Sequence, residues 1–267
     1  MTPRLVKHLI YSFFYLLAMA VIFWLIYIFF LKPAPTCFDK IKNQGETGID
    51  CGGPCPSCEL AELKPLAVKE VMALPARENE ISLLAGIANP NPNFGVQTFS
   101  YKFQVFGPFN ALLETVEGQS FIYPGEEKYL IEPSLKINLQ DVSRVKLSIN
   151  EEEIVWQSKE KMDKSNLDIL SRQTIISNGT VTVKGIIQNK NPLLIPQIKI
   201  IAILYNLQRN QILNASYTTL NDLEGEEQQN FSIEFPKGDW IKKLDLNRTK
   251  IFIEPRTEII KTLNPKH

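Results

Sequence analysis

The hydrophobic and polar residues divide the chain into three regions. From Leu9 to Leu31 the chain runs for 23 residues without a charged side chain. Residues 32–60 are rich in Gly, Pro and Cys, and from residue 64 onward short apolar segments alternate with turn residues. These patterns predict a long apolar helix, a small turn-rich module and a β-rich region.

The apolar run is long enough to cross a bilayer. At about 1.5 Å per residue it spans a hydrocarbon core of roughly 30 Å, and its ends carry Tyr11 and Tyr27, whose rings favour the interface. We predict a cytoplasmic tip at residues 1–8 and an uncleaved transmembrane signal anchor at residues 9–31. A cleaved signal peptide is the alternative, because Ala18-Met19-Ala20 resembles a cleavage site. Cleavage there would leave an apolar segment at the new N-terminus.

The stalk and cysteine-rich module, residues 32–60, contains all four cysteines of the protein: Cys37, Cys51, Cys55 and Cys58. Two disulfide bonds would staple a segment that is too short to form a hydrophobic core. One zinc ion held by four thiolates is the alternative, although only Cys55 and Cys58 have the close spacing of a zinc knuckle. The sequence favours the disulfides.

The cysteines also indicate the orientation of the chain. Basic residues flank the apolar run on both sides, so the positive-inside rule does not decide it. Disulfides form in oxidising compartments. We therefore predict a single-pass protein of the cell membrane, with a cytoplasmic N-terminus and extracytoplasmic C-terminal domains.

Four side chains with oxygen atoms lie between the cysteines: Asp39, Asn43, Glu46 and Asp50. Such hard ligands near glycine turns suit a calcium ion. They equally suit a second role, in which they accept hydrogen bonds from backbone N–H groups in tight turns. The pattern favours the turn-stabilising role and leaves the cation role open.

The segment from Cys37 to Cys58 resembles a cysteine motif of extracytoplasmic proteins with the form C-x-D-x(3)-N-x-x-E-T-x-x-D-C-G-G-x-C-x-x-C. The match extends to residue types and spacing, except that Lys40 replaces a glycine that is usual after the Asp. The resemblance implies a surface location and no catalytic activity.

The β-rich region contains an internal repeat. Two pairs of segments align at a constant offset of 100 residues: Ile81–Pro92 with Val181–Pro192, and Tyr123–Glu127 with Leu223–Glu227. We therefore predict two homologous modules and a tail, at residues 64–158, 165–256 and 257–267.

Each module has the pattern of an antiparallel sandwich. Phe99, Tyr101 and Phe103 alternate with polar residues, which predicts a half-buried strand with its aromatic face toward the core. The equivalent segment of the second module, Gln197–Tyr205, is apolar on both faces, which predicts a covered strand. The predicted fold class is mainly β, with an N-terminal transmembrane helix, a small disulfide-rich module and two tandem immunoglobulin-like antiparallel β-sandwiches.

The second module resembles the FxLYD-type domain and the related late-embryogenesis-abundant-like β-sandwich. The resemblance rests on the strand from Val181 to Pro192, on Ile203-Leu204-Tyr205-Asn206 and on Leu223-Glu224-Gly225-Glu226. Asn206 replaces the usual Asp and Glu224 the usual Pro, and the first module matches less well. The resemblance implies a non-catalytic extracytoplasmic module.

Composition excludes several functions. The 29 basic and 29 acidic residues give no net charge, which argues against nucleic-acid binding. The two histidines, His8 and His267, lie outside the predicted modules, and no catalytic or dinucleotide-binding motif occurs. We expect no enzyme activity, no catalytic residue, no cofactor and no metal ion.

The remaining hypothesis is a non-catalytic surface or envelope module that binds a protein or a glycan. The turns that follow the second strand of each module are the candidate partner-contact loops, represented by Asn89, Asn91, Asn189 and Asn191. A structural or assembly subunit of a membrane complex is the alternative. An enzyme is the third hypothesis, and it would require a cleft with convergent carboxylates.

Overall fold

The computed structural model describes residues 3–27, 36–162, 164–207 and 211–256 of the chain. The chain divides into two compact units, Met1–Leu63 and Lys64–His267. The predicted tail at residues 257–267 lies outside the described residues.

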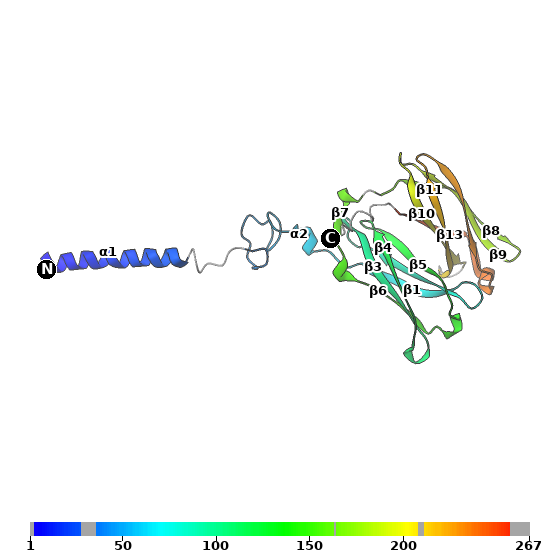
Figure 1. Cartoon of the computed structure of the whole chain (residues 1–267), viewed down its shortest axis with the longest axis horizontal. Coiled ribbons are helices and arrows are strands. Elements are labelled where there is room, and N and C mark those ends of the chain that lie inside the picture. Colours follow the sequence, from blue (N-terminus) through cyan, green and yellow to red (C-terminus); the bar gives the residue numbers. More distant parts are fainter. Residues whose placement is uncertain (1–2, 28–35, 163, 208–210, 257–267) are drawn as a thin grey trace, which may run out of the picture. The chain divides into compact units, whose positions relative to one another are not determined.

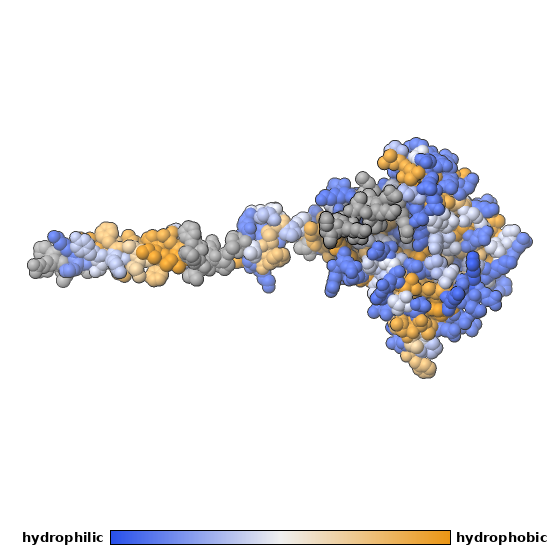
Figure 2. Space-filling view, in the orientation of Figure 1, coloured by the Kyte–Doolittle hydropathy of each residue, from blue (hydrophilic) through white to orange (hydrophobic). Residues whose placement is uncertain are grey.

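The first unit begins with helix α1, Pro3–Ile26 (Figure 1). From Ile10 to Tyr27 every side chain is exposed. Figure 2 shows a largely apolar surface on this helix, most strongly toward its C-terminal end. No helix in the described part of the chain combines the length and the apolar character needed to cross a membrane. The last residues of the predicted span, 28–31, lie outside the described residues.

Helix α2, Cys58–Ala61, is a single turn at the end of the cysteine-rich module. The Ser57 hydroxyl accepts a hydrogen bond from the Glu59 N–H and so caps its N-terminus. Between the two helices the described chain consists of turns, as its glycines and prolines predict.

The second unit is built of antiparallel sheets, which confirms the mainly β fold class. The first module has two sheets, one in the order β1-β2-β5 and one in the order β4-β3-β6, with β7 also paired to β3. The strands are β1 Ala67–Pro75, β2 Ile81–Ala88, β3 Phe94–Phe106, β4 Leu112–Ile122, β5 Glu127–Leu135, β6 Arg144–Ile149 and β7 Trp156–Ser158.

The second module has the same strand order, with sheets β8-β9-β12 and β11-β10-β13. Each of its strands begins 99 to 101 residues after its counterpart in the first module, and Figure 1 shows the two sets of strands. The strands are β8 Leu167–Ser177, β9 Thr180–Asn189, β10 Ile195–Asn206, β11 Ile212–Leu223, β12 Gln228–Phe235 and β13 Leu244–Arg256. Short 3₁₀ helices occupy η2 Pro108–Asn110, η3 Leu139–Asp141, η4 Glu151–Glu153, η5 Lys159–Lys161 and η6 Asp239–Lys243.

Each module encloses its own core between its two sheets. In the first, the predicted aromatic face of β3 is buried, with Phe99, Tyr101 and Phe103 packed against Leu83 and Ile87 of β2 in one apolar cluster. This confirms both the strand prediction and the face that it turns inward. The second module has an equivalent cluster between β9 and β10.

A third apolar cluster joins the two modules. Leu84 of β2 and Ile131 of β5 face outward from the first module and pack with Ile201 and Ile203 of β10. Since alternate residues of β10 also line the core of the second module, this strand is buried on both faces, as its sequence predicts. The shared cluster explains why residues 64–256 form one unit.

A buried ion pair lies at the edge of this cluster. The ammonium of Lys128 donates hydrogen bonds to the Ser120 hydroxyl (3.0 Å), the Phe121 carbonyl (2.9 Å) and the Glu254 carboxylate (2.8 Å). The side chains of Lys128 and Glu254 are only 7% and 16% exposed. Lys128 belongs to the first module and Glu254 to the second, so the pair connects the two.

Candidate functional site

The cysteine-rich module contains two disulfides among its described residues. Cys37 bonds to Cys55, and Cys51 bonds to Cys58. Each bond therefore connects alternate cysteines along the chain. This confirms the predicted disulfides and disfavours the zinc alternative, because no thiolate remains to bind a metal.

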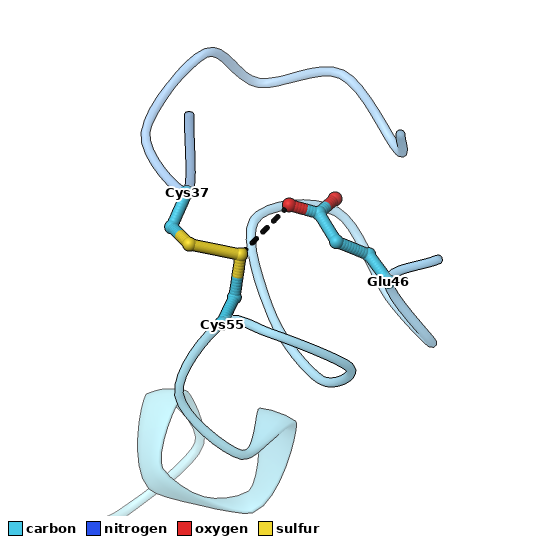
Figure 3. A group of neighbouring side chains, drawn as sticks. All are labelled: Cys37, Glu46 and Cys55. Atoms are coloured by element: carbon cyan, nitrogen blue, oxygen red, sulfur yellow. Dashed lines mark hydrogen bonds between the residues drawn. A yellow bond between two sulfur atoms is a disulfide. The ribbon is translucent and has the colours of Figure 1, made fainter. Parts of the chain in front are cut away.

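A buried carboxylate lies against the first disulfide (Figure 3). Glu46 is only 5% exposed, and its Oε1 lies 3.1 Å from the sulfur of Cys55. Its Oε2 accepts hydrogen bonds from the backbone N–H groups of Asn43 (3.3 Å) and Asp50 (3.1 Å). The disulfide sulfur has no hydrogen to donate, so the contact at Oε1 is a close polar contact. Glu46 thus links two turns to each other beside the Cys37–Cys55 bond.

The other predicted oxygen ligands, Asp39 and Asp50, also accept hydrogen bonds within the turns. Asp39 accepts hydrogen bonds from the Ile41 N–H (2.9 Å) and the Asn43 side-chain amide (2.8 Å). Asp50 accepts from the N–H of Lys40 at 3.0 Å, and Lys40 has a positive φ of 59°. The hydrogen bond from Asn43 is the main reason why the pKa of Asp39 lies below its usual value. These contacts match the turn-stabilising role, while the cation role stays a prediction.

Three potential metal ligands do converge in the described part of this module. The sulfurs of Cys37 and Cys55 and a carboxylate oxygen of Glu46 lie within 4.8 Å of one another (Figure 3). Metal binding by cysteine requires the thiolate, and both sulfurs are consumed by the disulfide. In this oxidation state the group offers a metal one carboxylate.

The role of Glu46 can be tested by substitution. Glu46→Ala is expected to leave two backbone N–H groups without an acceptor, at about 1–3 kcal/mol each, and to expose the disulfide. Glu46→Gln retains an oxygen that can accept both bonds. Thiol alkylation during timed reduction should therefore show several-fold faster opening of Cys37–Cys55 in the alanine variant than in the glutamine variant. Glu59→Ala changes an exposed carboxylate of the same module and is the control. Equal rates in all three variants would contradict the role.

The predicted partner-contact asparagines form an internal hydrogen-bond network in each module. Asn189 is fully buried, at 0% exposure, and its amide donates to the carbonyls of Leu193 (2.9 Å), Leu223 (3.1 Å) and Glu224 (3.0 Å). Its Oδ1 accepts the backbone N–H of Asn191 at 2.9 Å. One asparagine thus ties the end of β9 to the start of β10 and to the turn after β11.

The first module repeats this network. The Asn89 amide donates to the carbonyls of Phe94 (2.7 Å) and Tyr123 (2.9 Å). Asn91 exchanges hydrogen bonds with the backbone of Lys64, at 3.0 and 2.8 Å. These side-chain amides therefore point into the protein, where they donate hydrogen bonds to backbone carbonyls. Contact between the loops and a partner stays a prediction, but Asn89, Asn91 and Asn189 are buried and do not offer their amides to it.

The structure also reveals a cleft between the modules that the sequence analysis did not find. It has a volume of about 390 Å³ and is lined by residues of the segments 121–129, 164–167 and 251–255 and by Ile201 of β10. Lys128 and Glu254, which form the buried ion pair, lie in its wall. The lining segments are far apart in sequence, and the internal repeat marked only one of them, at Tyr123–Glu127.

Comparisons with known proteins do not assign a family. No protein-family model and no curated protein matches the chain. Among solved structures, red sea bream transglutaminase aligns with 73% of this chain at 7% identity and a TM-score of 0.25, and the chain covers 29% of that enzyme. The tandem CBM22-1-CBM22-2 domain of Paenibacillus barcinonensis Xyn10C aligns with 73% of this chain at 6% identity and a TM-score of 0.16, with 87% of that domain covered. At these TM-scores neither likeness carries an argument about function.

Proposed function

We propose that the protein is a single-pass, membrane-anchored extracytoplasmic protein whose tandem immunoglobulin-like, FxLYD-type sandwiches bind a protein or glycan partner without catalysis. The observation that carries this proposal is the apolar helix α1, whose side chains are exposed on every side from Ile10 to Ile26. Water is a poor solvent for such a surface, and a bilayer is a good one.

The sequence extends this apolar surface beyond α1. The uncharged run continues to Leu31, so it comprises 23 residues, more than the roughly 20 that span a bilayer core. The disulfides that follow support an extracytoplasmic location for the rest of the chain, because they persist in oxidising compartments.

The packing of the second unit supports binding over catalysis. Two sandwiches joined by a shared apolar cluster give a rigid support for exposed loops and strand edges. The charged pair in the cleft between them is engaged in its own hydrogen bonds. A partner would therefore contact the outer loops and edges, and the chemistry of a reaction is not provided in that cleft.

Charged substitutions in α1 test the anchor. The double variant Leu17→Arg/Met19→Arg is expected to lose carbonate-resistant membrane association, because each arginine at the centre of a span costs about 2.5–3.5 kcal/mol. Leu193→Arg, at an exposed loop of the second module, should remain in the membrane fraction and is the matched control. Retention of the double variant after carbonate extraction would refute the anchor. Protease protection of residues 64–256 in closed vesicles reports their side of the membrane.

Crosslinking in native membranes tests the binding role. Recovery of the same glycan or protein from the wild type, and its loss from variants in the exposed loops, is the expected result. A fixed stoichiometric complex that survives all loop variants would instead indicate an assembly subunit.

A further inference from the structure

The hairpin between β3 and β4 presents an exposed aromatic side chain at its tip. Phe109 and Asn110 both have positive φ, at 54° and 63°. Hairpin turns of this geometry normally use Asn, Asp or Gly, because a larger side chain is strained there. The side chain of Phe109 is nevertheless 105% exposed, so it gains no packing within the described protein. An aromatic residue in this conformation and environment indicates a role outside the fold.

Three exposed leucines lie in the segments next to Phe109. Leu112 and Leu113 begin β4, Leu139 begins η3, and all three are exposed. The two segments lie together, since a Cβ on Gly107 would be 3.1 Å from Leu113 and 3.3 Å from the carbonyl of Asp141. We call Phe109, Leu112, Leu113 and Leu139 the apolar tip. Figure 2 shows apolar surface over this hairpin, at the lower edge of the view.

The apolar tip is held in place by a basic residue. The Arg144 guanidinium donates a hydrogen bond of 2.8 Å to the Asn110 side chain and lies 4.8 Å from the centre of the Phe106 ring. Two further exposed lysines, Lys136 and Lys146, flank the same end of the module. Two exposed acids, Glu114 and Asp141, lie in the same segments, so charges of both signs surround the apolar tip.

The size of this surface fits a lipid bilayer better than a protein. With about 200 Å² for an exposed aromatic side chain, the apolar tip offers on the order of 400 Å². A stable protein interface buries about 800 Å² on each partner. A tip of half that area suits a surface that needs no matching shape, and Arg144 lies beside it to contact an anionic headgroup. We propose that the apolar tip inserts into the headgroup–acyl boundary of the membrane that anchors the chain, a role that rests on the proposed anchor.

Tryptophan fluorescence in vesicles tests this proposal on the full chain. The protein is reconstituted into phosphatidylcholine–phosphatidylglycerol vesicles with and without brominated phosphatidylcholine, which quenches tryptophan on contact. The emission added by Phe109→Trp should fall at least about twofold in brominated vesicles. The emission added by Leu193→Trp, at an exposed loop of the other module, should be unchanged. Native Trp24 in α1, measured by difference against Trp24→Phe, reports the anchor separately.

Each outcome decides a separate point. Unquenched Phe109→Trp emission overturns the insertion of the tip, whether or not Trp24 is quenched. Unquenched Trp24 with quenched Phe109→Trp refutes the anchor while supporting tip insertion. A blue shift of Phe109→Trp that increases with protein density but does not respond to bromine would overturn lipid insertion and indicate that a second copy covers the tip.

Discussion

Truncation of Lys128 to alanine is expected to lower the free energy of unfolding of the 64–256 unit by about 3–5 kcal/mol. The substitution leaves the carboxylate of Glu254 buried, because that side chain is only 16% exposed. Glu254 would lose both the hydrogen bond and the positive charge of Lys128. Denaturant unfolding under oxidising conditions, with the disulfides intact, measures the effect.

An exposed ion pair in the same module is the matched control. Lys102 and Glu117 are 2.6 Å apart, but their side chains are 47% and 68% exposed. Lys102→Ala should therefore cost no more than about 1 kcal/mol. The double variant Lys128→Met/Glu254→Leu, which removes both charges, should recover much of the stability that Lys128→Ala loses. Equal effects of Lys128→Ala and Lys102→Ala would contradict the importance of burial.

The same pair predicts a dependence on pH. Burial raises the pKa of Glu254, but the charge and hydrogen bond of Lys128, together with the charge of Lys199 and a hydrogen bond from Ser120, hold the pKa below its ordinary value of 4.5. The carboxylate thus contributes stability that is fully present above pH 4.5 and is lost as the pH falls through the lower, folded-state pKa. Unfolding curves between neutral and acidic pH should show this loss in the wild type and a smaller one in Lys128→Met/Glu254→Leu. If the free energy of unfolding depended on pH in the same way in the wild type and in the double variant, the contribution of the Glu254 carboxylate would be refuted.

Substitution of Asn189 is expected to have the other large effect. Asn189→Ala should destabilise the unit by about 3–5 kcal/mol, since buried groups that lose their hydrogen-bond partner cost about 1–3 kcal/mol each. Asn189→Asp, which keeps the shape, should cost at least as much, because it directs a carboxylate oxygen at three backbone carbonyls. Denaturant unfolding measures both variants.

Asn221→Asp is the control for this series. Asn221 is exposed on β11 and accepts a hydrogen bond from Gln197 through an oxygen that Asp retains. Its substitution should change stability by less than about 0.5 kcal/mol. Asn89→Ala, at the equivalent position of the first module, should resemble Asn189→Ala. If Asn189→Asp lowered the free energy of unfolding by less than about 1 kcal/mol, the hydrogen bonds donated by the Asn189 amide would not be important for stability.

Local patterns predicted the elements of this protein well. The alternation of Phe99, Tyr101 and Phe103 identified both β3 and its core face, because neighbouring side chains of a strand always point to opposite sides. The apolar character of β10 on both faces predicted that it is covered. The same signal was present in Ile81–Ala88 of β2, where every residue is buried, and it could have located the other half of the shared cluster.

The candidate sites were less predictable. The asparagines of the two turns were recognised, but their direction was not, since an exposed and an inward amide have the same sequence. The apolar tip was not predicted either, because its two segments, around Leu113 and Asp141, approach each other at Gly107 only in the folded chain.

The sequence by itself determined the order of the parts, the strands and their core faces, and the presence of disulfides, because each depends on residue types and on periods of a few residues. Only the tertiary structure decided which cysteines pair, which outer faces join the modules, and that Lys128 meets Glu254 across 126 residues of chain. These contacts depend on how distant segments pack in three dimensions, and no local pattern of side chains contains that information.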